Sequence, residues 1–231
     1  VVNGVEYTVV DEAMLEQMIE NEEDITVVCT TRVASMNSMF LLNSVFNQNI
    51  GSWDVSNVTD MYRMFTGAYS FNQPIGDWEV SSVTDMGIMF WEAESFNQPI
   101  GDWDVSSVTE MGGMFNDTPF NQPIGDWDVS NVTYMGTMFR DTPFNQPIGD
   151  WDVSSVTSMN WMLRYAIVFN QDIGNWDVSN VTDMGGMFGG CHEFNQDLSN
   201  WAVNNVTECG GFSFQNFEWT LPQPNFTNCN P

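Results

Sequence analysis

The sequence contains very few basic residues: four arginines and no lysine stand against 31 acidic residues, giving a formal net charge of −27. A chain this acidic is repelled by phosphate backbones and anionic lipid headgroups, so we expect no nucleic-acid partner. A single histidine leaves little material for acid–base chemistry or a metal centre. No apolar run approaches the roughly 20 residues needed to cross a bilayer, so we expect no direct membrane insertion.

Apolar material is nevertheless plentiful, because 42% of the 231 residues are hydrophobic. This fraction argues against a disordered chain and suits one domain or a short repeat array. The chain opens with Val1-Val2-Asn3 and without methionine. We therefore expect a processed form whose targeting signal has been removed.

The dominant feature is an internal repeat, marked by a tryptophan and by a phenylalanine that opens a Phe-Asn-Gln triplet. Both series advance in steps of 25, 25, 24, 24, 25 and 25 residues. The tryptophans are Trp53, Trp78, Trp103, Trp127, Trp151, Trp176 and Trp201, and the phenylalanines are Phe46, Phe71, Phe96, Phe120, Phe144, Phe169 and Phe194. A fixed period of this length is typical of stacked repeats.

Spacing within the unit predicts its local structure. Trp103 and Val105 alternate as on a short strand with one face inward, and the apolar steps across 108–115 fit one or two helical turns. Glycines that precede the tryptophan are expected to form a turn with unusual φ; they are Gly76, Gly101, Gly125 and Gly149. One unit cannot bury its apolar residues alone, so the units must stack.

The predicted fold class is therefore an α/β solenoid, with a ladder of short parallel strands on one side and short helices on the other. Residues 1–35 are expected to form an N-terminal cap of strand, helix and strand, with Asp11 as helix N-cap. Residues 36–212 would form the array of seven to eight units. Residues 213–231 would form a C-terminal cap.

The repeated sequence FNQ-x-I-x-x-WDVSNVTDM-x-x-MF resembles the leucine-rich repeats of BspA-like bacterial surface proteins, over roughly residues 27–212. This resemblance implies a right-handed, curved leucine-rich-repeat superhelix, secreted or displayed at a cell surface. It also implies adhesion or partner binding as the usual role. The family supplies no common catalytic residues.

Carboxylates flank the repeated tryptophans and should point outward if the indoles point inward. At a ladder spacing of about 4.8 Å they would form two adjacent columns. Calcium prefers clustered carboxylate oxygens, so the columns could bind it; diffuse screening by sodium is the alternative. The residues are Asp54, Asp77, Glu79, Asp102, Asp104, Asp126, Asp128, Asp150, Asp152 and Asp177.

Two further sets of residues carry predictions about surface and structure. Unit six departs from the consensus by introducing Trp161, Arg164 and Tyr165, residue types that are enriched at binding hot spots, so we predict a contact patch there. The asparagine of each Phe-Asn-Gln triplet should bond the backbone of neighbouring turns; these are Asn47, Asn72, Asn97, Asn121, Asn145, Asn170 and Asn195.

Cysteines and sequons suggest covalent features. Among Cys191, Cys209 and Cys229 one disulfide is expected, with the first two favoured because they fall on successive units. Cys29 lies at the other end of the array and should remain unpaired, as a core residue or at a head-to-tail contact between copies. Asn116 and Asn225 are the favoured glycan acceptors if the chain is secreted by a eukaryote.

Together these features predict a non-catalytic extracellular or surface protein that binds a protein, a glycan or its own copies. The alternative is a secreted structural or matrix component that depends on calcium bound to the acidic columns. A glycosidase built on carboxylate pairs is the third reading, disfavoured because an active site usually breaks a repeat pattern once.

Overall fold

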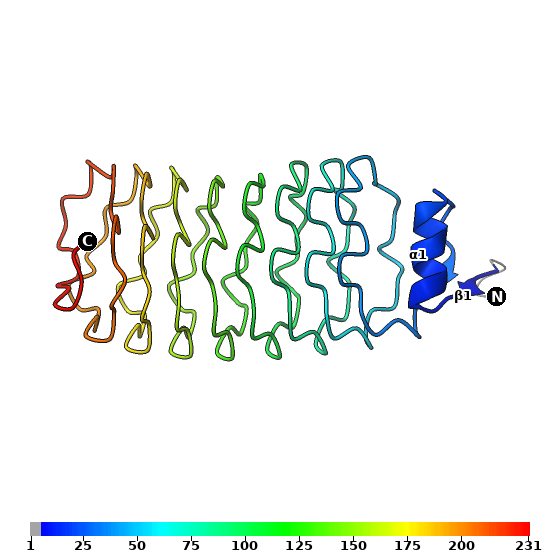
Figure 1. The fold of residues 1–231 in the computed structure, drawn as a ribbon, viewed down its shortest axis with the longest axis horizontal. Helices are drawn as coiled ribbons and strands as arrows, with labels where there is room; N and C mark the ends of the chain where they lie inside the picture. Colours follow the sequence, from blue (N-terminus) through cyan, green and yellow to red (C-terminus); the bar gives the residue numbers. More distant parts are fainter. Residues whose placement is uncertain (1–5) are drawn as a thin grey trace.

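The structure, a computed structural model, describes residues 6–231; Val1 to Asn3 lie outside the described residues. Successive coils of 24–25 residues follow one another along the long axis from the N-terminal to the C-terminal end, as Figure 1 shows. A single helix lies across the N-terminal end of this stack. The coils themselves consist of turns and short extended segments.

The N-terminal end holds strand β1 (Thr8–Val9), helix α1 (Glu12–Glu20) and strand β2 (Val28–Cys29), in the order that the sequence predicts. The two strands pair in parallel, with Thr8 opposite Val28. Asp11 caps α1 by accepting a hydrogen bond from the Met14 amide at 2.9 Å, as expected of an N-cap. Leu15 of α1 is fully buried, so the helix covers the apolar end of the stack.

Neighbouring coils are joined by backbone hydrogen bonds along the Thr-Asp-Met-x-x-Met-Phe segment of the repeat. Isolated parallel bridges connect equivalent residues through the whole array: Ser35–Asp60, Asp60–Asp85, Asp85–Glu110, Glu110–Tyr134, Tyr134–Ser158, Ser158–Asp183 and Asp183–Glu208. The Thr59 amide donates to the Ala34 carbonyl of the preceding coil, and from Met61 onward alternate amides donate to the next coil, as Met61 does to the Asp85 carbonyl at 2.9 Å. From Met64 onward the amides between them donate to the carbonyl three residues earlier in the same coil, as Met64 does to Met61 at 3.1 Å.

This ladder corrects the predicted arrangement of strand and helix. Within residues 6–231 α1 is the only helix; in the segment 108–115, Glu110 lies in the ladder and 112–115 form turns. Gly113, inside that segment, has a φ of 63°, which interrupts any right-handed helix. The Trp-Asp-Val segment, expected to form the parallel ladder, makes no backbone hydrogen bond to a neighbouring coil among the described residues. The strand was therefore assigned to the wrong side of the coil.

The indoles nevertheless point inward as predicted, and they connect the coils through their side chains. Trp103 is 3% exposed and its Nε1–H donates to the Ile75 carbonyl of the preceding coil at 3.0 Å. Equivalent bonds recur at Trp53, Trp78, Trp127, Trp151, Trp176 and Trp201. Phenylalanines stack in two further columns, with Phe65 and Phe90 5.5 Å apart between ring centroids. These aromatic columns form one continuous core.

The glycines before the tryptophans serve a different purpose from the one predicted. None of Gly76, Gly101, Gly125 and Gly149 has a positive φ. A Cβ on Gly101 would instead lie 2.6 Å from the Pro123 carbonyl oxygen of the next coil. Glycine is required there because two backbones approach closely, which is a steric requirement and not a conformational one.

Residues that follow the last coil cover its apolar end. The Trp219 ring packs edge-on against Phe194 at 4.8 Å, and its Nε1–H donates to the Gln196 carbonyl at 2.9 Å. The Asn195 side-chain oxygen accepts hydrogen bonds from the amides of Thr220 and Leu221. The terminal segment therefore continues the bonding pattern of the coils before it.

Candidate binding face

One surface of the stack carries much of the variation between coils. We call it the ladder face; it consists of residues 60, 62, 63, 66 and 67 and their equivalents in the other coils. Three of the four arginines of the chain lie here among exposed or half-buried aromatic residues. The aromatic and basic residues of this face are Tyr62, Arg63, Trp91, Tyr134, Arg140, Trp161, Arg164 and Tyr165.

The structure brings the three residues of the predicted contact patch together on this face. The Arg164 guanidinium carbon lies 5.3 Å from the centroid of the Trp161 ring and 5.0 Å from that of Tyr165. The Trp161 side chain is 41% exposed. Arg140, which the sequence reasoning missed, also lies over Trp161, at 5.7 Å. Its position 24 residues before Arg164, one unit earlier, is the signal that could have revealed it.

Charge within the patch is only partly neutralised. Across residues 6–231 the one ion pair joins Arg140 to Asp141 at 3.0 Å. Arg164 has no carboxylate within ion-pairing distance; its Nη2 donates weakly to the Tyr165 hydroxyl at 3.4 Å, and its buried Nε has no hydrogen-bond partner. The patch thus holds an uncompensated guanidinium on a strongly acidic protein.

Two aromatic residues of the patch occupy positions where the backbone of the coil is left-handed. Trp161 and Tyr165 have φ values of 56° and 58°, in a region that bulky residues rarely occupy. The equivalent residues of the other coils also have positive φ, as Arg63 (60°) and Asp141 (57°) do, so this conformation belongs to the repeat and is not particular to the patch. The next coil carries Gly186 and Gly190 at the equivalent positions, and a Cβ there would lie 2.4 Å and 2.3 Å from the respective aromatic rings. The rings therefore lie over glycines whose missing side chains make room for them.

A second group of aromatic residues on the ladder face lines a hollow of about 330 Å³ nearer the N-terminus. Tyr62 and Tyr134 contribute to its lining together with Asp85 and Glu110. Burial raises the pKa of Asp85, assisted by the neighbouring Asp60 carboxylate and opposed by a hydrogen bond from the Gly87 amide. This hollow contains two carboxylates, whereas the hollow beside the contact patch contains one, that of Asp141.

The predicted acidic columns lie on the opposite, tryptophan-bearing part of the coil, and all ten carboxylates are exposed. Several already have a structural role: Asp104 Oδ1 accepts hydrogen bonds from the Ser106 hydroxyl at 2.6 Å and from its amide at 3.1 Å. These bonds lower the pKa of Asp104, and equivalent ones lower those of Asp152 and Asp177.

No backbone ladder runs along the columns among the described residues, so the ladder spacing of about 4.8 Å expected from the sequence does not apply to them. Stacked Trp78 and Trp103 rings are 6.5 Å apart. Two unit charges at about 6.5 Å repel by about 0.6 kcal/mol in water. In residues 6–231 no group of three or more His, Cys, Asp and Glu side chains is arranged to bind a metal ion. Calcium binding by the columns stays a prediction.

The asparagine column has the structural role that was predicted. The Asn97 side-chain oxygen accepts hydrogen bonds from the Asn121 amide at 3.0 Å and from the Gln122 side chain at 3.1 Å, both in the next coil. The same pair of bonds recurs between several other coils. These side chains therefore act as a second ladder.

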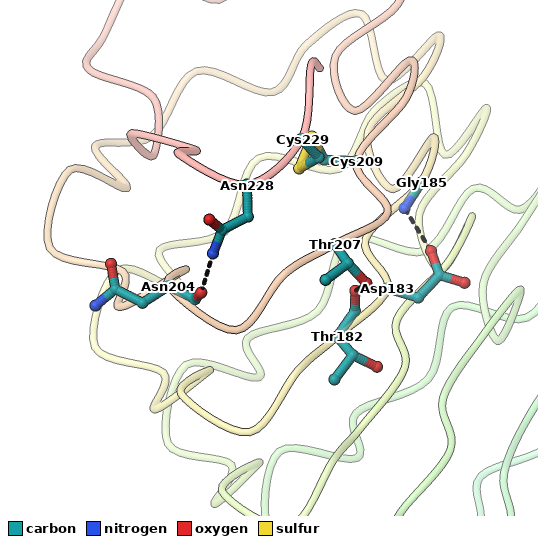
Figure 2. The surroundings of a disulfide bond; sticks show 8 residues. All are labelled: Thr182, Asp183, Gly185, Asn204, Thr207, Cys209, Asn228 and Cys229. Carbon is teal, nitrogen blue, oxygen red and sulfur yellow. Dashed lines mark hydrogen bonds between the residues drawn. A yellow bond between two sulfur atoms is a disulfide. The ribbon is translucent and has the colours of Figure 1, made fainter.

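The disulfide joins Cys209 to Cys229, with 5.9 Å between their Cα atoms (Figure 2). The favoured pairing of Cys191 with Cys209 was wrong. Cys191 occupies the inward position of Ala166 one coil earlier and is fully buried, whereas Cys209 occupies that of Met184. Burial raises the pKa of the Cys191 thiol, and Sγ donates to the Ala166 carbonyl. In Figure 2 the Asn228 amide also bonds the Asn204 carbonyl, fixing the terminal segment.

The two glycan predictions have different outcomes. Asn116 is 1% exposed, so its amide is not accessible in the folded chain and the prediction was wrong. Asn225 is exposed. Whether it carries a glycan stays a prediction.

The two ends of the stack are not equivalent, which bears on the predicted head-to-tail contact. In the last coil the amides of Cys209, Gly211 and Ser213, which correspond to ladder donors, bond no group among the described residues. At the other end Glu12 of α1 accepts hydrogen bonds from the amides of Ala34 and Ser35. The helix therefore occupies the side where a second copy would have to dock. Head-to-tail association stays a prediction.

The stacked coils and the variable face define a repeat protein. The chain belongs to the family described as Mycoplasma protein of unknown function, DUF285, whose model matches residues 11–123 and again residues 114–218. No curated protein and no solved structure matches the chain. Among residues 6–231 there is no helix of the length and apolarity that a membrane span requires.

Proposed function

We propose that this chain is a non-catalytic solenoid of the BspA-like leucine-rich-repeat type that binds a protein or glycan through its ladder face, outside the cell or at its surface. The observation that carries the proposal is the concentration of aromatic and arginine side chains on one face of an otherwise repetitive, acidic chain. Trp, Tyr and Arg are the residue types most enriched at binding hot spots.

The experiment measures binding of the purified protein to arrayed extracellular proteins and glycans. Trp161→Ala removes the centre of the contact patch, and Asp126→Ala, on the opposite part of the coil, is the matched control. A ligand of the ladder face loses binding to the Trp161 variant and keeps binding to the Asp126 variant. Ligands whose binding is lost in Asp126→Ala and unchanged in Trp161→Ala would contradict the proposal.

The calcium-dependent structural component is the second proposal, carried by the exposure of both carboxylate columns. Calorimetric titration with calcium in 0.5 M salt separates it from diffuse screening. Saturable heat that disappears when the columns are neutralised supports calcium sites. A featureless titration supports screening and removes this alternative.

A further inference from the structure

We propose that the contact patch of Trp161, Arg164 and Tyr165 recognises a carboxylate side chain of a partner protein, with an apolar side chain of the same segment in the adjoining hollow. This inference rests on the proposed function and specifies the class of partner. It follows from three properties of the patch: an unpaired charge, a fixed geometry and an apolar neighbour.

The positive charge of Arg164 is unpaired. Arg164 is stacked between two aromatic rings and has no carboxylate partner, although the chain carries 31 acidic residues. Arg140, one coil away on the same tryptophan, is paired with Asp141. The guanidinium fork matches a carboxylate in a bidentate geometry. Arg63 also lacks a carboxylate partner among residues 6–231, but it lies over one ring, that of Tyr62, whereas Arg164 lies over two. Arg164 is therefore the unpaired arginine of the ladder face whose position is most closely defined.

The Arg164 side chain is held in a fixed geometry. A free arginine side chain loses much rotamer freedom on binding, which weakens a complex. Arg164 is held between Trp161 and Tyr165, whose rings in turn lie over Gly186 and Gly190. Much of that ordering cost is therefore already met in the free protein.

The hollow beside the contact patch exposes aliphatic side chains, which favours a protein partner over a glycan. A hollow of about 570 Å³ adjoins the patch, lined by Asp141, Thr142, Pro143, Tyr165, Ile167 and Val168. Ile167 and Val168 are 50% and 39% exposed. Burying this aliphatic surface under an apolar side chain of the partner favours binding. The hydroxyl groups of a sugar would instead lose their hydration against it.

The overall charge constrains the rest of the partner segment. A net charge of −27 repels a polyacidic partner at long range. The segment that fits therefore carries one aspartate or glutamate beside an apolar residue, in otherwise neutral or basic surroundings.

A random-peptide display library, selected on the intact protein in 0.15 M salt, tests this inference without a known ligand. Selected peptides are expected to share an acidic residue beside an apolar one. A synthetic peptide of that kind should bind Arg164→Gln about ten- to a hundredfold more weakly, since hydrogen bonds to charged groups are among the strongest. Arg63→Gln, on the same face but stacked on Tyr62, is the matched control and should bind normally.

Further variants separate this inference from the proposed function. Arg164→Lys keeps the charge and loses the planar fork, so it should bind with intermediate affinity; changing the peptide's acid to its amide should remove the dependence on Arg164. Peptides that need Trp161 but bind Arg164→Gln normally would overturn the carboxylate inference and leave the proposed function standing. Failure to enrich peptides, or Arg164-dependent binding confined to carboxylated glycans, would also overturn it.

Discussion

Replacing a repeated tryptophan by phenylalanine measures how much the indole hydrogen bonds contribute to stacking. In Trp103→Phe the Ile75 carbonyl, now paired with Nε1–H at 3.0 Å in the buried core, loses its donor. An unsatisfied buried acceptor costs about 1–3 kcal/mol. The smaller ring also leaves unfilled core volume, at about 1–2 kcal/mol for the few methylene equivalents lost. We expect the free energy of unfolding to fall by about 2–5 kcal/mol.

Urea denaturation followed by circular dichroism checks this value, with Trp161→Phe as the matched control. The Trp161 ring is 41% exposed, and it lies against two arginines and over Gly186, so its replacement should cost less than about 1 kcal/mol. Equal losses at the two positions would show that the inter-coil indole bond adds nothing, and would refute the reasoning.

Three other perturbations test separate contacts by the same denaturation assay. Gly101→Ala should cost about 1–3 kcal/mol because its Cβ meets a carbonyl oxygen at 2.6 Å, whereas Gly210→Ala, with nothing within 4 Å, should be nearly neutral; equal effects would contradict the close-approach argument. Asp85 has a raised pKa in the folded chain, so its ionised form weakens the fold above that pKa and the penalty disappears as pH falls below its unfolded value. Asp85→Asn should therefore stabilise at pH 7 by less than about 1 kcal/mol and have no effect near pH 3, and a loss at pH 7 would contradict this sign. Reducing the Cys209–Cys229 bond, with its sequence separation of 20, should cost about 3 kcal/mol, and an unchanged midpoint would show that it does not constrain unfolding.

The sequence predicted the features that depend on side-chain period and failed where the backbone path mattered. Buried tryptophans and the Asp11 cap follow from spacing and from local hydrogen-bonding chemistry, and both are confirmed. Inward positions at 108, 111, 114 and 115 fit a helix, but they fit a chain of turns equally well. The left-handed backbone at Gly113 decides between them, and the sequence does not reveal it because Arg63, Ile88 and Thr137 have the same conformation at the equivalent positions of other coils.

At the candidate site the sequence identified residues but not their partners. Trp161, Arg164 and Tyr165 could be found because they depart from the repeat. Their rings pack against Gly186 and Gly190 because the side chains point toward the next coil and not the preceding one, and the sequence does not define that direction. The predicted disulfide pairing was wrong for a similar reason, since Cys191 and Cys209 lie on successive units but at different positions around the coil.

Amide hydrogen exchange resolved by residue tests most directly where the coils are joined. The amides of Gly113 and Phe115 donate to the Gly136 and Met138 carbonyls of the next coil, at 2.8 and 3.0 Å. Those of Asp104 and Val105 donate to no group within residues 6–231. Slow exchange at Gly113 and Phe115 with faster exchange at Asp104 and Val105 is the predicted result. The reverse order would place the ladder on the tryptophan side and contradict the account of both the fold and its binding face.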